Sequence, residues 1–204
     1  MAEGRTLPAF RPLPQKTPDV KMTRKGDTFY ISANQAPGDR PKTVPHCLDE
    51  RAAQHPDRPF LRERDLKTDE WVTVTYGEAR AITDSLAQAF LDLGAGPVAP
   101  VMLLSGNSIR AAMVILAAQK IGAPAAPISV PYSTMSSDFD KLKHCFDAVK
   151  PAVVFAEQLA PFRKAVAALP AGAFKIVSAE PAGDNAVMSY DTLCATAPTP
   201  ALSL

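Results

Sequence analysis

The sequence predicts an α/β protein with a doubly wound, mostly parallel sheet and helices on both of its faces. The first observation is a set of four short apolar runs, each with the composition of a buried strand. The second is that segments with helical spacing of apolar residues alternate with these runs along the chain. Two buried strands joined by a helix form a parallel unit with a right-handed crossover. The four predicted strands are Pro100–Leu104, Ala125–Ser129, Ala152–Ala156 and Phe174–Ser178.

The amino-terminal part of the chain is less regular. Residues 1–25 are rich in proline and charge and lack periodicity, so we expect a flexible arm there. A strand is expected at Thr28–Ala33, and a helix at 43–54 with a threonine cap and a proline in its first turn. A polar, turn-like segment separates Phe60–Arg64 from Trp71–Thr75, which predicts a small antiparallel hairpin before the main sheet.

The helix that follows this hairpin has the clearest start in the sequence. Thr75 and Glu78 have the spacing of a capping box, in which each side chain accepts a hydrogen bond from the backbone amide of the other residue. Gly94 is placed to end the helix. The apolar stripe of the helix consists of Ala79, Ile82, Leu86, Phe90 and Leu93.

The remaining predicted helices connect the strands of the sheet. Asn107 or Ser108 caps the helix that follows the first strand, and Gly122 ends it. Ser136 or Ser137 caps a helix that Pro151 terminates, and another helix is expected at 161–169. The periodic signal fades from Ala179 onwards. We therefore expect an arm at 1–25, an α/β domain at 26–180 and a polar, proline-rich tail at 181–204.

The composition limits the classes of function. Hydrophobic residues make up 47% of the chain, which is enough for a core, and the net charge of +1 leaves no electrostatic footprint for nucleic acid or an acidic membrane surface. The three cysteines are odd in number and far apart, which predicts reduced thiols and a cytoplasmic protein. The longest apolar run, Ala111–Ala118, is far shorter than the roughly 20 residues of a membrane span.

Several polar clusters are candidate sites. The turn at 105–108 precedes a helix N-terminus, but it contains one glycine and no phosphate-binding motif, so helix capping explains it better than anion binding. Two adjacent His–Cys pairs lie half the chain apart, which disfavours a zinc site. The first hairpin mixes both signs of charge, which indicates a solvated surface. The zinc candidates are His46, Cys47, His144 and Cys145, and the hairpin charges are Arg62, Glu63, Arg64, Asp65, Lys67 and Asp69.

The end of the second predicted strand is a further candidate. Ser129, Ser133 and Thr134 lie where strand ends face the binding crevice of an open α/β sheet. The same residues around Pro131 also suit a loop whose hydroxyl groups fix turns. The sequence leaves these two interpretations open, and no nucleophile elbow points to catalysis.

The chain resembles the amino-terminal part of the acyl-adenylate-forming enzymes, the AMP-dependent synthetase/ligase superfamily, over about Phe29 to Ala156. Within this superfamily it is most similar to the feruloyl-CoA synthases. The superfamily pattern is carried by PDRPFL, WVTVTYGEARAITDSLAQAFLDLG, SGNSIRAAMVILAAQKIGAPAAPIS and KPAVVFA, and the feruloyl-type pattern by FYIS, VPHCLDERA and APISVPYSTMSSDFDKLKHCF.

The resemblance implies an ATP-dependent, AMP-forming aryl-acid CoA ligase. In such an enzyme a carboxylate such as ferulate attacks Mg-ATP to form an acyl-adenylate, and coenzyme A then displaces AMP. The resemblance also implies that region 26–180 is part of the enzyme's amino-terminal domain. The partners of the full-length enzyme would be a small aromatic carboxylate and CoA, with no nucleic acid and no membrane.

The family's functional segments have no counterpart in this chain. The phosphate loop, the acidic adenylate-binding segments and the catalytic lysine are expected after Leu204, so no catalytic residue and no metal ligand is assigned. Some relatives have a basic side chain that meets CoA phosphates in the region where this chain has Tyr132, so this role is not transferred. Ser129, Tyr132 and Ser133 are candidates for cofactor binding, and no other cofactor-binding residue is assigned. We expect a fragment that binds none of ATP, Mg²⁺ and CoA tightly and is inactive alone.

Two other functions stay open at this point. One is a free-standing, non-catalytic α/β binding or interaction module. The other is part of an adenylation domain that loads a carrier protein instead of CoA. The coding sequence downstream of Leu204 distinguishes them most simply, because the ligase requires a Thr/Ser-Gly-rich phosphate loop there.

Overall fold

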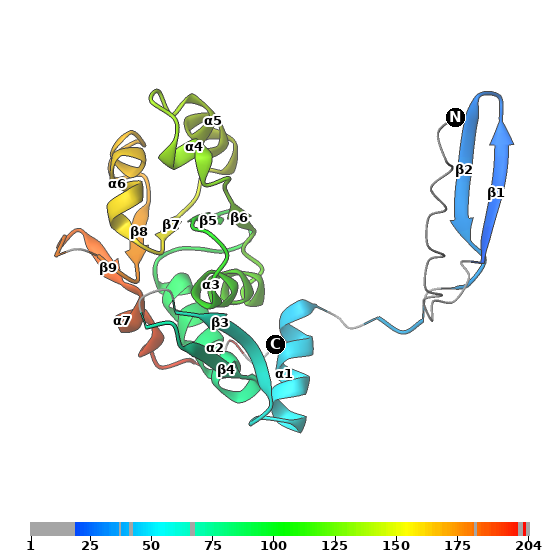
Figure 1. The fold of residues 1–204 in the computed structure, drawn as a ribbon, viewed down its shortest axis with the longest axis horizontal. Coiled ribbons are helices and arrows are strands. Elements are labelled where there is room, and N and C mark those ends of the chain that lie inside the picture. The colour runs from blue at the N-terminus through cyan, green and yellow to red at the C-terminus, as the bar shows by residue number, and fades with distance from the viewer. Residues whose placement is uncertain are drawn as a thin grey trace, which may run out of the picture. The chain divides into compact units, whose positions relative to one another are not determined.

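A computed structural model describes residues 19–36, 38–40, 43–65, 68–181, 183–199 and 202. The chain divides into two units, residues 1–40 and residues 41–204 (Figure 1). The second unit contains the α/β fold that the sequence predicts. None of the described helices has the length and apolar character needed to span a bilayer.

The first unit contains an antiparallel hairpin of two strands, β1 (Val20–Lys25) and β2 (Thr28–Ala33). Gly26, with a φ of 60°, lies in the two-residue turn between them, where hairpins favour glycine. The predicted strand at 28–33 is confirmed. The prediction of an irregular arm is wrong for Val20–Lys25, since pairing with β2 makes this charged segment a strand. Residues 1–18 of the predicted arm lie outside the described residues.

The second unit is built on a five-stranded parallel sheet with the order β6-β5-β7-β8-β9 (Figure 1). The predicted parallel strands are confirmed, although the second strand ends at Pro127 rather than Ser129. The strands are β5 (Val101–Leu104), β6 (Ala125–Pro127), β7 (Val153–Ala156), β8 (Lys175–Ser178) and β9 (Val187–Ser189).

Helices cover both faces of this sheet, as predicted (Figure 1). Alternate residues of a strand point to opposite faces, so Val101 and Leu103 of β5 join one apolar cluster, whereas Met102 and Leu104 join the other. The first cluster includes α1 (Val44–Gln54), α2 (Tyr76–Asp92), α3 (Ile109–Lys120) and α7 (Tyr190–Cys194). The second includes α5 (Asp140–Val149) and α6 (Leu159–Ala167).

The predicted antiparallel hairpin before the sheet is also confirmed. It consists of β3 (Pro59–Arg64) and β4 (Trp71–Thr75). Phe60, Leu61 and Val74 pack against the first apolar cluster, so the hairpin is attached to the helices of that face.

Several boundaries differ from the sequence prediction. The helix expected from Ser136 or Ser137 begins at Asp140, because Phe139 adopts a left-handed conformation with φ 58°. The Ser136 hydroxyl accepts a hydrogen bond from the Phe139 amide at 3.0 Å and so stabilises the turn before the helix. The short helix α4 (Pro131–Thr134) was not predicted.

The largest difference lies in the predicted polar tail. Within residues 181–204 the chain forms strand β9 and helix α7. Val187, Tyr190 and Leu193 are buried, so this segment is part of the core rather than a tail. The prediction was wrong because both elements are too short to show periodicity and are specified by packing and by pairing with β8.

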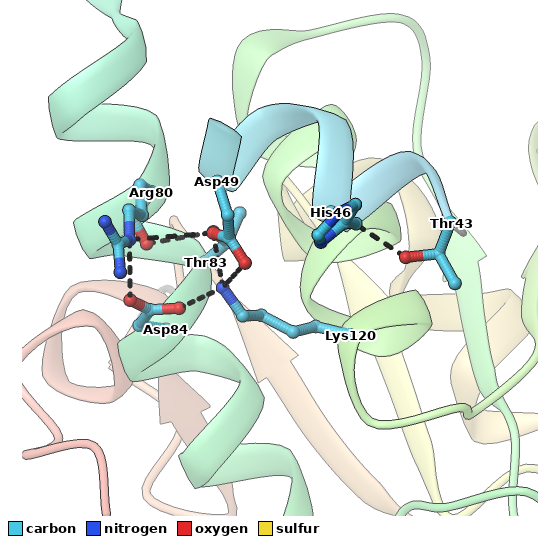
Figure 2. A network of polar contacts seen from close by, with 7 residues as sticks. All are labelled: Thr43, His46, Asp49, Arg80, Thr83, Asp84 and Lys120. Carbon is cyan, nitrogen blue, oxygen red and sulfur yellow. Dashed lines mark hydrogen bonds and ion pairs between the residues drawn. The ribbon is translucent and has the colours of Figure 1, made fainter. Parts of the chain in front are cut away.

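A cluster of ion pairs joins three of the helices on the first face of the sheet, α1, α2 and α3. The Lys120 ammonium group of α3 lies between the carboxylates of Asp49 on α1 and Asp84 on α2, as Figure 2 shows. Lys120 Nζ lies 2.8 Å from Asp49 Oδ1, and the Lys120 side chain is 8% exposed. The Arg80 guanidinium lies 3.6 Å from Asp49 and 3.8 Å from Asp84. Two cations therefore balance two anions where α1, α2 and α3 meet.

The capping box of α2 is present and yields a first prediction. The Glu78 carboxylate accepts a hydrogen bond from the Thr75 amide at 2.8 Å, and this bond holds the pKa of Glu78 below its ordinary value. Replacing Thr75 by alanine removes the reciprocal bond to the Glu78 amide and should cost about 1 kcal/mol of unfolding free energy.

The stabilisation that the Glu78 carboxylate contributes should decrease as the pH falls. Because its pKa is lowered by folding, the stabilisation is present above the ordinary carboxyl pKa and is lost as the pH falls through the folded-state value. Chemical denaturation of wild type and Glu78→Ala should show a difference in unfolding free energy at neutral pH that shrinks in acid. A difference that grows in acid would contradict this account.

Candidate functional site

A cavity of about 650 Å³ lies at the carboxyl-terminal edge of the central strands. Its walls come from the turn after β5, the first residues of α3, the segments after β7 and β8, and the β3–β4 hairpin. This is the position at which open α/β sheets bind ligands. The polar residues that line it are Glu63, Arg64, Asp65, Asn107, Ser108, Arg110, Glu157, Gln158, Glu180 and Tyr190.

The N-terminus of α3 at this cavity is occupied by side chains of the protein. The Ser108 hydroxyl accepts a hydrogen bond from the Ala111 amide at 3.0 Å, which confirms the predicted cap. The Glu63 carboxylate, from β3, accepts one from the Ile109 amide at 2.7 Å. A carboxylate therefore already holds the place at which an anion would bind a helix N-terminus.

The turn after β5 is held by a second carboxylate. The Ser105 hydroxyl lies 3.0 Å from Glu157 Oε2 in the segment after β7. The Arg110 guanidinium lies 4.0 Å from Glu157 Oε1. These contacts couple the ends of two neighbouring strands to the first turn of α3, so the wall of the cavity is an ordered polar surface.

The charge of the cavity lining is unfavourable for a polyphosphate. Four carboxylates, those of Glu63, Asp65, Glu157 and Glu180, face two guanidinium groups, those of Arg64 and Arg110. Phosphate binding in proteins depends on cationic side chains and free backbone amides. Carboxylates outnumber the cationic side chains of this lining, so its charge disfavours the phosphates of ATP.

Tyr190 is the remaining titratable residue of the lining. Burial raises the pKa of Tyr190 far above its ordinary value. Burial likewise raises the pKa of Cys194, the thiol with which Tyr190 interacts. Both shifts oppose formation of a phenolate or thiolate, so neither group is activated as a base or nucleophile at neutral pH.

A smaller cavity of about 300 Å³ lies beside α6 and β9. Its walls are mainly apolar, with Leu159, Val166 and Phe174 among them. Arg163 and Asp184 also line it and pair with each other at 3.2 Å. It offers an apolar surface without the convergent polar groups that mark the larger cavity.

The residues predicted from the sequence as binding candidates lie beyond the end of β6, and none of them lines the larger cavity. Ser129 is exposed. Tyr132 is half-buried, and the Lys141 ammonium group lies 5.3 Å from the centre of its ring. Ser133 is 3% exposed, and its hydroxyl has no hydrogen-bond partner among the described residues. Thr134 donates its hydroxyl to the Val130 carbonyl, which suits a turn.

The sequence analysis missed the role of Glu63. Its alternation with arginines indicated a solvated hairpin, but its side chain is half-buried and closes the α3 N-terminus. No local signal reveals this contact, because 46 residues separate the two partners. Lys67 of the same hairpin lies outside the described residues. Among the residues that the structure describes, no group of His, Cys, Asp or Glu side chains is arranged to hold a metal ion.

Comparison with known proteins places this geometry in context. A family model described as AMP-binding enzyme matches residues 48–200. No curated protein matches the chain in sequence.

Solved structures share the fold. Acetoacetyl-CoA synthetase from Streptomyces lividans is 22% identical, with a TM-score of 0.61 over 76% of this chain and 25% of the synthetase. The luciferase-like enzyme from the nonluminescent Zophobas morio mealworm is 18% identical, with a TM-score of 0.58 over 74% of this chain and 33% of that enzyme. An artificially fused adenylation–PCP di-domain from Klebsiella oxytoca is 21% identical, with a TM-score of 0.51 over 74% and 23%. The chain thus spans about a quarter to a third of these structures.

Proposed function

The chain belongs to the AMP-binding enzyme family, and on that premise we propose that it forms the amino-terminal α/β part of an AMP-forming ligase. The observation that carries the proposal is the family match over residues 48–200, which includes the whole parallel sheet and its helices except the first turn of α1. Enzymes of this family use ATP and CoA and act on carboxylates. In the proposed reaction a carboxylate displaces pyrophosphate from ATP to give an acyl-adenylate, and a thiol then displaces AMP.

We infer that this part of the enzyme acts as a scaffold and that other residues bind the phosphates. Glu63 blocks the α3 N-terminus, and carboxylates outnumber guanidinium groups in the larger cavity. A single helix N-terminus contributes about 0.3–1 kcal/mol to an exposed anion, whereas even a millimolar dissociation constant requires about 4 kcal/mol. We assign no catalytic step to the described residues, because no group of His, Cys, Asp or Glu side chains among them is arranged to hold a metal ion.

We propose an aryl acid such as ferulate as the substrate of the complete enzyme. The support is the resemblance of the segment APISVPYSTMSSDFDKLKHCF to feruloyl-CoA synthases. Ser129, Tyr132 and Ser133 belong to this segment and remain candidates for a ligand contact. A carrier protein is the alternative thiol acceptor, since the fold is shared with an adenylation–PCP di-domain.

The test is pyrophosphate exchange into ATP with ferulate present. We expect the 204-residue chain to give no exchange above a no-enzyme control and no heat of Mg-ATP binding in calorimetry. A protein translated from the native coding sequence continued past Leu204 should exchange pyrophosphate and form feruloyl-CoA.

Three results would contradict parts of this proposal. Micromolar ATP binding by the 204-residue chain would contradict the scaffold role. A stop codon directly after Leu204 in the intact gene would favour a free-standing module over the ligase. Transfer of the acyl group to a carrier protein but not to CoA would replace the proposed acceptor.

A further inference from the structure

The β1–β2 hairpin has one apolar face that no other described residue of its own unit buries. In the observed register Val20 pairs with Ala33, Met22 with Ile31 and Arg24 with Phe29, so these side chains share one face. Every residue of both strands is exposed. Met22 is 64% exposed and Ile31 is 67% exposed. A two-stranded hairpin is marginally stable in water, whereas a sheet of three or more strands with an apolar face is stable.

The two edges of the hairpin differ in charge. Strand β1 carries Lys21, Arg24 and Lys25, and charged residues on an edge strand oppose pairing with another chain. Strand β2, with the sequence TFYISA, has no charge, no proline and no glycine and is rich in β-branched and aromatic residues. Among the described residues of this unit β2 pairs only with β1, so its other edge is open to strand addition, whereas the β1 edge is protected.

The alternation of backbone hydrogen bonds along β2 shows which of its amides and carbonyls point away from β1. The Asn34 amide donates to the Asp19 carbonyl across the hairpin, so even-numbered residues of β2 direct their backbone groups towards β1. The amides and carbonyls of Phe29, Ile31 and Ala33 then point outward.

We propose that the β2 strands of two copies of this chain pair antiparallel and form a four-stranded sheet. A β1–β1 contact would bring six cations together, and a β1–β2 contact would be heterologous and would not close. The β2–β2 contact is isologous and free of charge repulsion. This inference does not depend on the proposed enzymatic activity.

The register of the contact follows from the faces of the strands. The apolar side chains of the two copies lie on the same face of the sheet only if odd-numbered residues of one β2 strand lie opposite odd-numbered residues of the other. Pairing Tyr30 with Tyr30 of the partner subunit satisfies this condition. It also places Phe29 opposite Ile31 of the partner subunit twice, and aromatic and β-branched residues form favourable cross-strand pairs.

Cysteine cross-linking tests this register. In a chain whose native cysteines, Cys47, Cys145 and Cys194, are changed to serine, Tyr30→Cys should form a disulfide-linked dimer on mild oxidation. The Cα atoms of a non-hydrogen-bonded antiparallel pair are about 4.5 Å apart, within the range of disulfides. Thr23→Cys is the matched control, because Thr23 lies opposite Tyr30 on the same face but on β1. We expect its dimer to form at least tenfold more slowly.

Sedimentation of the unmodified chain gives the second measurement. Wild type should be in a monomer–dimer equilibrium, and Ile31→Lys should weaken the dimer at least tenfold. Val98→Lys, at a residue that is 95% exposed in the other unit, should leave the equilibrium unchanged. Circular dichroism checks that each variant stays folded. A wild-type chain that remains monomeric, an unchanged equilibrium for Ile31→Lys, or equal cross-linking rates at positions 23 and 30 would overturn the proposal.

Discussion

Replacing Lys120 by alanine should lower the free energy of unfolding by about 3 kcal/mol. Removing one partner of a buried ion pair typically costs about 3–5 kcal/mol, because it leaves the other charge uncompensated. Here the loss leaves the carboxylates of Asp49 and Asp84 facing each other with Arg80 as their remaining cation (Figure 2). The lower end of the range applies because these two carboxylate side chains are 31% and 23% exposed and keep contact with water.

Urea denaturation of Lys120→Ala and Lys120→Met separates charge from packing. Methionine keeps an apolar stem of similar length, so a comparable loss in both variants would assign the effect to the missing ammonium group. The control is Lys164→Ala at an exposed position on α6, where a change within about 0.5 kcal/mol is expected. A loss for Lys120→Met no larger than that of the control would show that the cluster contributes little to stability.

Replacing Leu116 by alanine should cost about 2–5 kcal/mol through lost transfer free energy and the cavity left behind. Leu116 lies on α3 and is 8% exposed within the apolar cluster between the sheet and the helices of its first face. The same cluster contains Phe90 of α2 and Met113 of α3, which are fully buried. A rigid surrounding of this kind collapses only partly around a deleted side chain.

The matched control for this prediction is Leu91→Ala. Leu91 lies on α2 but is 38% exposed, so the same chemical change should alter the unfolding free energy by no more than about 0.5 kcal/mol. Equal losses for Leu116→Ala and Leu91→Ala would show that α3 does not pack as described. Denaturant midpoints with unchanged slopes are required for both variants, because a changed slope would indicate a change in compactness.

The sequence alone was sufficient for four of the five strands of the parallel sheet, the hairpin before it and the starts of α1, α2 and α3. The signals that predict these features lie within a few residues of one another in the sequence. Residues at consecutive or nearly consecutive positions form the capping box of Thr75 and Glu78, the Ser108 cap and the four-residue apolar strands. The membership in the AMP-binding family could also be inferred from such local patterns, because the strand–helix–strand unit is itself one of them.

The tertiary structure alone decided which distant groups meet. Glu63 closes the α3 N-terminus, Lys120 joins α1 to α2, and the segment at 187–194 completes the sheet and its first face. Each of these contacts joins residues far apart in the chain, and their side chains have no local pattern that distinguishes them from solvated charges or a polar tail. The physical reason is that burial and charge compensation depend on the packed neighbours of a residue, whereas helix caps and strand periodicity depend on its neighbours in sequence.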